Sequence, residues 1–304
     1  MGGVAILIGS LLALLMGLPL QQWIAMKYFF ISVALMFLIG LRDDVLALTP
    51  RQKLFSQFLP VLVLIFLENV TLSSFYEMTD GASFVMPITY FISILTVIII
   101  SNAYNLIDGI DGLAGTMGFL VTFFFGVWFY IAGLPFLSLI ALCFAGALFA
   151  FLLFNWQPSI IFMGDTGALT VGLVLSFFAI RFINYNFQLP EGHIAKFNAS
   201  ISTAVCILII PIFDTLRVIV LRLRKMQSPF HADRNHIHHQ LLSLGMTHAG
   251  AVKWIAGMNL FFIALALAMK TQSDLLILPI VVFLCLLVNF VLKRRQQIRN
   301  STHA

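Results

Sequence analysis

Charged residues are scarce in this 304-residue chain, since Asp, Glu, Lys and Arg together make up 10% of it. An ordinary soluble domain has about 25%. Hydrophobic residues account for 61%, which is more apolar surface than a soluble fold could bury. The composition therefore excludes an ordinary soluble domain and indicates that most of the chain is surrounded by lipid.

Cysteine is also scarce. Cys143, Cys206 and Cys285 each lie alone within an apolar run, so we expect them to pack as small hydrophobic residues and to form neither a disulfide nor a zinc site. The first apolar run starts at Val4, with no preceding cation and no A-x-A cleavage pattern. This argues against a cleaved signal peptide, and we expect the run to remain as a helix.

Long apolar runs separated by short polar connectors make up most of the chain. Backbone polar groups in hydrocarbon must be bonded internally, so spanning segments are helices or closed barrels, and these runs lack the alternation of barrel strands. Each run is near the roughly 20 residues that a helix needs to cross a bilayer. We therefore predict an all-α, polytopic integral membrane protein, a single domain over residues 1–304 with about ten transmembrane helices at 4–20, 26–41, 54–67, 87–103, 115–132, 134–154, 168–183, 200–221, 252–270 and 274–292.

Lysine and arginine are unevenly distributed among the connectors. With the N-terminus inside, twelve lie in inside segments and four in outside connectors or adjoining helix ends. Such an excess is typical of cytoplasmic loops, so both termini are predicted to be cytoplasmic, and the net charge of +5 does not indicate nucleic-acid binding. The longest connector, 222–251, is predicted to be a histidine-rich cytoplasmic loop, and 293–304 a basic cytoplasmic tail.

Four polar segments share that inside face, namely 42–53, 102–111, 155–166 and 222–248. Seven of the twelve acidic residues lie in these segments or in the inside half of a span. Ionisable groups near membrane depth usually pair, face a cavity or bind a cation, and Mg²⁺ is often held by one or two carboxylates together with substrate phosphates. The sequence thus predicts a magnesium-containing active site on the cytoplasmic face.

Each carboxylate taken alone also allows a structural interpretation. Asp108 and Asp111 are three residues apart and would share a face in a helical turn, but an Asx-type turn would use them too. The adjacent pair Asp43 and Asp44 suits a general base as well as a solvated helix end. Asp165, between two glycines at the mouth of a span, suits a metal ligand as well as a helix N-cap.

Histidine is concentrated in one segment. A zinc site there is conceivable, but no cysteine is close and the spacing does not match the H-E-x-x-H type. Histidines next to an arginine suit phosphate recognition better. The four histidines and the arginine are His231, His236, His238, His239 and Arg234.

Four motifs, in chain order, are LRDDVLALTPRQKL, SNAYNLIDGIDGLAG, FMGDTGAL and SPFHADRNHIHHQL. They resemble the motif series of the polyprenyl-phosphate N-acetylhexosamine-1-phosphate transferases, and the resemblance covers nearly the whole chain. Members of that family are multi-pass enzymes of the bacterial cytoplasmic membrane. They transfer a sugar 1-phosphate from a UDP-sugar to a polyprenyl phosphate and release UMP, which starts cell-envelope glycan synthesis, including that of O-antigen. The HIHH form is similar to the WecA and TagO branch, whose donor is typically UDP-N-acetylglucosamine, rather than to the branch that uses UDP-MurNAc-pentapeptide.

The resemblance implies how the donor and its cation would be bound. Asp165 and Asn105 would hold Mg²⁺, with Mn²⁺ as the alternative ion. Asp108 and Asp111 would line the nucleotide and phosphate pocket and act in catalysis. The further contacts implied are Asn155 and Phe162 to the uridine, and Arg234, His236, His238 and His239 to the sugar and diphosphate.

The resemblance also implies an acceptor site for undecaprenyl or another polyprenyl phosphate. Asp43 or Asp44 would act as the base or orient the lipid phosphate, and Lys53 would contact it. Phosphoryl transfer depends on positioning and charge neutralisation more than on covalent catalysis. We therefore expect direct in-line attack of the lipid phosphate on the β-phosphorus of the donor, with Mg²⁺ bridging the diphosphate. The lipid bilayer is the other partner, and a homodimer is left open.

The start of the chain departs from the family pattern, which normally has another N-terminal helix and a loop with a Pro-Arg-x-Gly-Gly element. Residues 2–6 resemble the tail of that element. From this resemblance we expect one more helix and the rest of that loop to lie upstream of Met1.

Two rival functions are compatible with some of these features. A transporter would use intramembrane charges such as Asp214 and Arg217, which we expect to pair along one helix face. It would also have polar residues near the bilayer midplane and two repeated halves, whereas the polar residues of this sequence cluster at one face and no repeat is found. A di-metal, histidine-rich membrane oxidase or hydrolase would need more histidine clusters than one.

Overall fold

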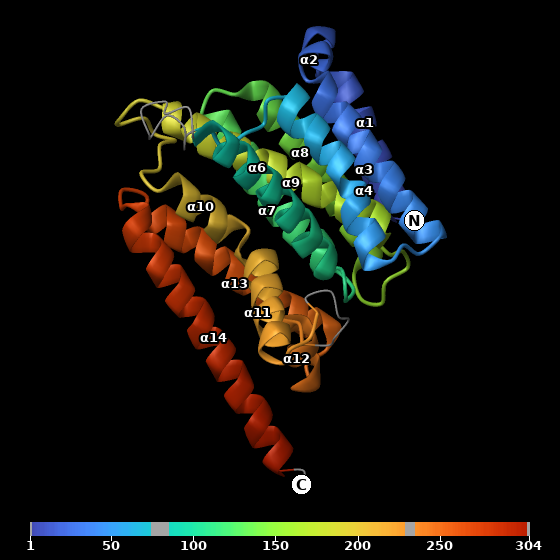
Figure 1. Ribbon diagram of the computed structural model, residues 1–304, viewed down its shortest axis with the longest axis vertical. Helices are drawn as coiled ribbons and strands as arrows, with labels where there is room; N and C mark the ends of the chain where they lie inside the picture. Colours follow the sequence, from blue (N-terminus) through green and yellow to red (C-terminus); the bar gives the residue numbers. More distant parts are fainter. Residues whose placement is uncertain (1, 74–84, 229–234, 303–304) are drawn as a thin grey trace.

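Helices dominate the part of the chain that the structure describes. A computed structural model describes residues 2–73, 85–228 and 235–302, and within these ranges it contains helices and turns but no strand. This confirms the predicted all-α fold class. The helices, shown in Figure 1, are α1 (Gly2–Gly17), α2 (Leu20–Ala25), α3 (Lys27–Val45), α4 (Pro50–Leu62) with the π-helical continuation η1 (Val63–Leu67), α6 (Val85–Leu106), α7 (Leu113–Ile131), α8 (Pro135–Asn155), α9 (Gly164–Gln188), α10 (Ser200–Ile207), α11 (Ile209–Arg224), α12 (Ile237–Ser243), α13 (His248–Ala268) and α14 (Asp274–Thr302).

Several of these helices are long and apolar enough to cross a bilayer. Six meet that description in the described ranges, namely α6, α7, α8, α9, α13 and α14 up to Arg299, and the number is seven if the bent pair α10 and α11 forms one span. The chain is therefore a multi-pass membrane protein. Helix α1 has 16 residues, or about 24 Å of length, and α3 carries charges at both ends, so the expected number of ten spans stays a prediction.

The predicted span at 200–221 differs from a simple helix. Helices α10 and α11 meet at an angle of 82° next to Leu208. Pro211 lies three residues after the break and has no N–H to donate to Ile207, four residues earlier, so a continuous helix would lose that bond and its ring would crowd the Ile207 carbonyl. The bend directs α11 away from the direction of α10 (Figure 1).

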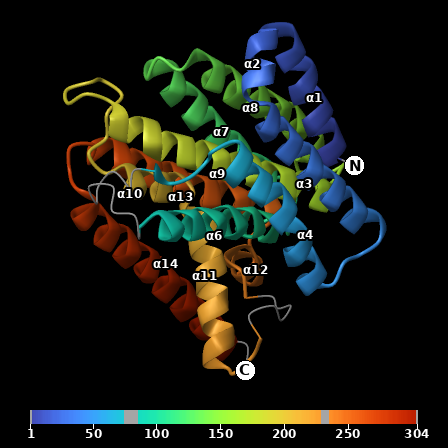
Figure 2. The same ribbon diagram turned by 45° about the horizontal axis from the view of Figure 1, so that its top comes forward.

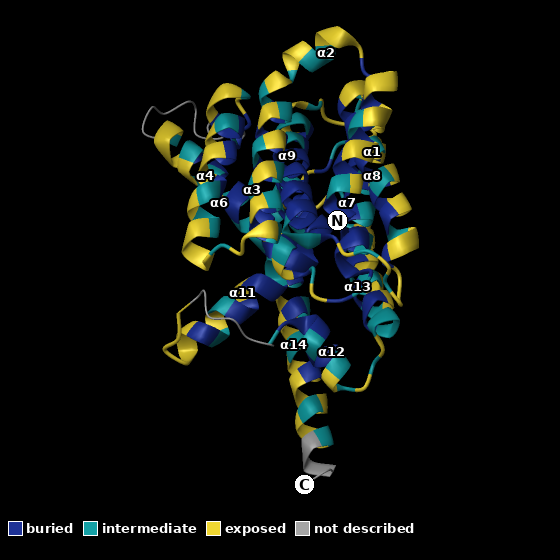
Figure 3. Ribbon diagram, turned by 90° about the vertical axis from the view of Figure 1, so that its right-hand side faces the viewer, coloured by how far each residue is buried: buried dark blue, intermediate teal, exposed yellow. Residues whose placement is uncertain are grey.

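Helix α9 lies at the centre of the bundle. It contacts α1, α3, α6, α7 and α10, and Figure 2 shows it among the other helices. Nearly its whole length is buried (Figure 3). Lipid offers little hydrophobic driving force for helix association, so membrane helices depend on close packing through small residues. A Cβ atom added at Gly172 of α9 would lie 2.7 Å from Ser101 Cα of α6, which shows how closely the two backbones approach.

The basic segment at 293–304 is helical through Thr302, since α14 continues without interruption from the apolar stretch that begins at Asp274. The histidine-rich segment contains a short helix, α12, between the end of α11 and the start of α13. Both segments therefore form part of the helical architecture in the described ranges.

The approach of α6 to α9 predicts a specific packing defect. Gly172→Ala forces its methyl against the α6 backbone, and overpacking of this kind costs about 1–3 kcal/mol, so the melting temperature in detergent should fall. Gly146→Ala is the matched control, because Gly146 is an exposed α8 glycine with open space around its Cβ position. Equal melting temperatures for both variants would contradict the close approach.

Candidate active site

The four polar segments meet at one end of the bundle. Asp165, at the start of α9, accepts a hydrogen bond from Asn105 Nδ2 at 2.7 Å and is ion-paired with Lys53 of α4. The loop between α6 and α7 is joined to the end of α8 by the bond from Gly112 N to Asn155 Oδ1, at 2.9 Å. The side chain of His238 in α12 packs against Gly109. Segments far apart in sequence thus enclose one polar region.

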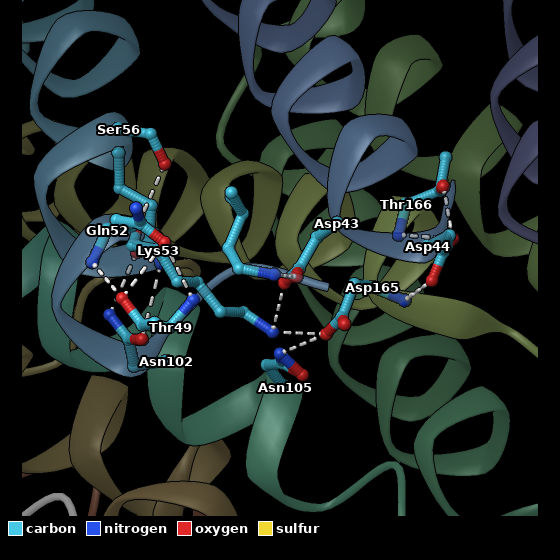
Figure 4. Close-up of polar contacts among 12 residues, drawn as sticks. Asp43, Asp44, Thr49, Gln52, Lys53, Ser56, Asn102, Asn105, Asp165 and Thr166 are labelled. Atoms are coloured by element: carbon cyan, nitrogen blue, oxygen red, sulfur yellow. Dashed lines mark hydrogen bonds and ion pairs between the residues drawn. The ribbon is translucent and has the colours of Figure 1, made fainter. Parts of the chain in front are cut away.

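Lys53 lies at the centre of this region. Its ammonium group is between Asp43 Oδ2, at 2.9 Å, and Asp165 Oδ1 (Figure 4). Asp43 is buried and also accepts from Leu48 N at 2.7 Å. The neighbouring Asp44 faces the start of α9 instead, where it accepts from Asp165 N and Thr166 N. One cation therefore bridges two of the carboxylates predicted to form the site.

The local sequence explains the orientation of Lys53. Thr49 and Gln52 form a capping box at the start of α4, and Pro50 occupies the first helical turn, where a missing N–H has no cost. The helix is thereby started one turn before Lys53. One turn after it, the buried Gln57 exchanges hydrogen bonds with Asn102 of α6. Lys53 and Gln57 lie four residues apart on the same helix face, which is directed into the bundle.

Asp108 lies in the loop between α6 and α7, close to the other carboxylates. Burial, together with the negative charges of Asp165 and Asp44, raises the pKa of Asp108 to about 7, while the Gly164 amide acts in the opposite direction. Like charges confined in one region disfavour further ionisation. The cluster of Asp43, Asp44, Asp108 and Asp165 contains more negative charge than Lys53 alone compensates, which favours the entry of another cation.

Asp111 points to the neighbouring loop and to α13. Its Oδ1 accepts from Ser159 Oγ at 2.8 Å, and its Oδ2 lies 3.5 Å from His248 Nδ1, a distance that allows electrostatic attraction, although His248 Nδ1 has no hydrogen bond. Asp111 thus joins three segments at the edge of the site. Its predicted catalytic role stays a prediction.

The residues predicted to bind uridine differ in accessibility. Both ends of the Asn155 amide are engaged by the protein, since Oδ1 accepts from Gly112 N and Nδ2 donates to Ile161 O. Asn155 therefore holds two loops together. Phe162 is 67% exposed and Trp156 is 39% exposed, so these two rings offer the aromatic surface near the site that a base could stack on.

The histidine-rich segment is held by a buried ion pair. Asp214 of α11 lies 2.9 Å from Arg217 and 2.9 Å from His236 Nδ1, and it accepts from Ile237 N at 3.0 Å. The expected pairing of Asp214 with Arg217 is thereby observed. Arg217 also donates to the backbone carbonyl of Asn235. These bonds fix the start of α12.

The predicted sugar and diphosphate contacts are only partly visible. Burial and the neighbouring His239 lower the pKa of His238 to about 4, so His238 is neutral near pH 7, and its Nε2 is buried without a partner. In the protein without a ligand, His238 therefore contributes a neutral ring, and its predicted contact with the diphosphate stays a prediction. The ring of His239 lies beside that of His238, 4.3 Å away between centroids. Arg234 and His231 lie outside the described residues.

The predicted magnesium ligands suit an ion that the substrate helps to hold. Within the described ranges, no three His, Cys, Asp or Glu side chains are grouped as a complete metal site. Asp165 and Asn105 nevertheless lie together, and the Asp165 side chain is 30% exposed. Mg²⁺ commonly takes one or two protein ligands and completes its shell with phosphate and water. The donor set and the local excess of negative charge therefore fit this ion.

Sequence reasoning missed several polar partners of the site. Thr166 donates its hydroxyl to Asp44, Ser159 binds Asp111, and Gln57 pairs with Asn102. Thr166 and Ser159 lie within the motif segments, so their position was a usable signal. Gln57 was also detectable, because it is a polar residue within a predicted apolar span.

The raised pKa of Asp108 predicts an effect on stability. The carboxyl ionises less readily in the folded protein than at its ordinary pKa of 3.8, so its unfavourable contribution grows as the pH rises from about 4 and is complete above about 7. Asp108→Asn should therefore raise the melting temperature of the metal-free protein by several degrees at pH 8 and much less at pH 5. An equal shift at both pH values would contradict the assignment.

Comparisons with known proteins bear on the same region. The family model described as glycosyl transferase family 4 matches residues 26–183, just over half of the chain, and this range contains three of the four motifs. The chain is 28% identical over 292 residues to a probable undecaprenyl-phosphate N-acetylglucosaminyl 1-phosphate transferase of Bacillus subtilis (strain 168), with 96% of this chain and 78% of the relative covered.

Two further relatives extend the comparison. An undecaprenyl-phosphate alpha-N-acetylglucosaminyl 1-phosphate transferase of Yersinia pestis is 28% identical, over 81% of this chain and 66% of its own length. A phospho-N-acetylmuramoyl-pentapeptide-transferase of Wolbachia pipientis wMel is 35% identical, over 58% of this chain and 57% of its own length. The family expected from the motifs is confirmed: this chain is a member of glycosyl transferase family 4.

Proposed function

We propose that this protein transfers N-acetylglucosamine 1-phosphate from UDP-N-acetylglucosamine to a polyprenyl phosphate and releases UMP. The reaction would take place at the cytoplasmic face of a bacterial inner membrane, with both termini on that side. One observation carries the proposal. Lys53 lies between Asp43 and Asp165 next to Asn105, at an end of a membrane helix bundle where a lipid phosphate can meet a soluble nucleotide.

The names of the relatives support the acceptor and the transferred group. The names of the Bacillus and Yersinia proteins state an undecaprenyl-phosphate acceptor and N-acetylglucosaminyl 1-phosphate transfer. A decaprenyl-phosphate N-acetylglucosaminephosphotransferase of Mycolicibacterium smegmatis, 29% identical over 83% of this chain and 67% of the relative, supports a long polyprenyl acceptor. The uridine nucleotide of the donor, which these names do not print, is implied by the motif resemblance, and UMP would be the leaving group.

Lys53 and Asp43 would serve the acceptor. The Lys53 ammonium can shift from the carboxylates to an oxygen of the lipid phosphate, because its flexible side chain is only partly buried and an ammonium ion binds phosphate as a point charge. Asp43, released from this ion pair, can accept a proton from a lipid phosphate that arrives monoprotonated. Removal of the proton makes the attacking oxygen more nucleophilic, while Lys53 would position the lipid phosphate and reduce its electrostatic repulsion from the diphosphate.

Asp165 and Asn105 would hold Mg²⁺ at the diphosphate. When bound, Mg²⁺ withdraws negative charge from the diphosphate and makes UMP a better leaving group. In the reaction, the lipid phosphate oxygen forms a bond to the β-phosphorus, and the bond from the β-phosphorus to the bridging oxygen breaks. That oxygen leaves with the electron pair as part of UMP, so no covalent enzyme intermediate is required.

Other residues would position the donor. The exposed rings of Phe162 and Trp156 can stack on uracil, while Asn155 keeps their loop against Gly112. Neutral His238 and the Asp214-bound His236 form a firm boundary of the region that would receive the sugar. These two histidines would orient the sugar and shape its pocket more than they would neutralise the charge of the diphosphate.

The metal assignment predicts a large loss of activity at Asp165. Asp165→Asn keeps the shape of the side chain but removes the negative charge, so transfer should fall at least about 100-fold while the melting temperature stays close to that of the wild type. Glu191→Gln is the matched control, because this strongly exposed carboxylate lies in the loop after the other end of α9. Near-normal transfer by Asp165→Asn would contradict the assignment.

The donor assignment can be tested with purified protein, polyprenyl phosphate and Mg²⁺. UMP release should be fastest with UDP-N-acetylglucosamine, slower with UDP-N-acetylgalactosamine and slowest with UDP-MurNAc-pentapeptide. The last donor tests the alternative suggested by the Wolbachia relative. Failure of every donor to give UMP would refute the proposed reaction. Faster release from UDP-MurNAc-pentapeptide than from UDP-N-acetylglucosamine would contradict the donor assignment.

A further inference from the structure

The adjacent residues Asp43 and Asp44 have different surroundings, although the sequence offers both as a base. Asp43 bonds to Lys53 and to the backbone of the α3–α4 connector. Asp44 makes no such contact and bonds to the first residues of α9 (Figure 4). Neighbouring residues on a helix point about 100° apart, so α3 presents one carboxylate to Lys53 and the other to α9.

Asp44 supplies the cap that α9 lacks in its own sequence. The first amide groups of a helix have no partner within the helix, and the residue at the N-cap position of α9, Met163, makes no side-chain hydrogen bond. Asp44 Oδ1 accepts from Asp165 N at 2.8 Å, and Oδ2 accepts from Thr166 N at 3.0 Å and from the Thr166 hydroxyl. A carboxylate at this position also interacts favourably with the helix dipole.

The backbone around this cap is shaped to admit the carboxylate. Gly164 has φ +71°, and a Cβ atom there would lie 2.7 Å from Asp44 Oδ2. Gly40 lies one turn before Asp44 on α3, and a Cβ there would lie 2.6 Å from the Asp165 carbonyl oxygen. The contact of α3 with the start of α9 is therefore close on both sides of Asp44, and the backbone of Asp165 is held directly by it.

We propose that Asp44 is a positioning residue that acts through Asp165, and that Asp43 is the carboxylate of the pair that faces the reactants. This proposal rests on the proposed function for its catalytic part. Asp44 fixes the backbone from which the Asp165 side chain extends to Lys53 and Asn105. Both of its oxygens accept hydrogen bonds from the first residues of α9, so its side chain is directed at that helix and away from Lys53.

The first test measures metal binding without turnover. Mn²⁺ is titrated into the purified chain in detergent, and free Mn²⁺ is followed by electron paramagnetic resonance. Loss of a supporting contact typically weakens metal affinity 10–100-fold, so Asp44→Asn should raise the Kd for Mn²⁺ about tenfold, and Asp44→Ala more, because Asn retains one acceptor oxygen.

Asp274 offers a matched control for loss of a helix cap. Its Oδ1 accepts hydrogen bonds from Ser202 N, at 2.7 Å, and from Ser202 Oγ, near the start of α10. Helix α10 follows the C-terminal end of α9, whereas Asp165 lies at its N-terminal end. Asp274→Asn should lower the melting temperature as Asp44→Asn does, but its Kd for Mn²⁺ should stay within about twofold of the wild type. If Asp44→Asn weakened Mn²⁺ binding only by destabilising the fold, Asp274→Asn would raise the Kd for Mn²⁺ to a similar extent.

The second test separates positioning from direct catalysis. With saturating Mg²⁺ and donor, Asp44→Asn should keep kcat within about tenfold of the wild type, whereas Asp43→Asn should lose at least about 100-fold, the range expected for a group that transfers a proton. Thr166→Val removes one partner of Asp44. Its effect on the Kd for Mn²⁺ should not add to that of Asp44→Asn, because both changes disrupt the same cap.

Two results would overturn the proposal. One is a fall in turnover by about 100-fold or more for Asp44→Asn with wild-type Mn²⁺ binding and melting temperature, which would make Asp44 a catalytic residue. The other is wild-type Mn²⁺ binding for both Asp44→Asn and Asp44→Ala. If the wild-type chain releases no UMP, the proposed reaction fails, while the Mn²⁺ and melting measurements still decide whether Asp44 positions Asp165.

Discussion

The arrangement of the polar segments depends on the contacts that the first residues of α9 make with α3, α4 and α6. This helix is buried along nearly its whole length, so its first residues cannot shift without moving the core of the bundle. Asp165 leaves the helix at that point and meets Lys53 from α4 and Asn105 from the end of α6. A buried, apolar helix thus determines the position of a charged group at the end of the bundle, where an isolated carboxylate would otherwise be mobile.

Much of this arrangement could be predicted from the sequence. Hydropathy predicted the class of fold and the approximate positions of the helices. The distribution of lysine and arginine predicted that the four polar segments lie on one side. The separation of Asp43 from Asp44 could not be predicted, because it depends on which face of α3 packs on α9. The 82° bend between α10 and α11 also needed the structure, since a proline such as Pro211 is compatible with a kinked span as well as a broken one.

The roles of single side chains were harder to predict than their location. Asn155 and His238 both lie in the region expected from their motifs, yet Asn155 uses its amide to bind two backbone groups and His238 is buried against Gly109. A residue type in a motif indicates which chemistry is available, but the hydrogen bonds already made within the protein decide how much of it remains for a ligand. Such bonds come from tertiary contacts that no local pattern specifies.

Tertiary contacts also connect the histidine-rich segment to α11. Asp214 and Arg217 lie on the stretch of chain that follows the bend, and together they bond to His236, to Ile237 N and to the carbonyl of Asn235. A buried ion pair is costly when either partner is left alone, so these bonds favour one position of α12. Because His238 of that helix packs on Gly109 beside Asp108, the bend in the membrane helix and the geometry of the aspartate loop are physically linked. The two halves of the site, at α9 and at α12, are thus held in the same way: a carboxylate from one helix accepts hydrogen bonds from the start of another.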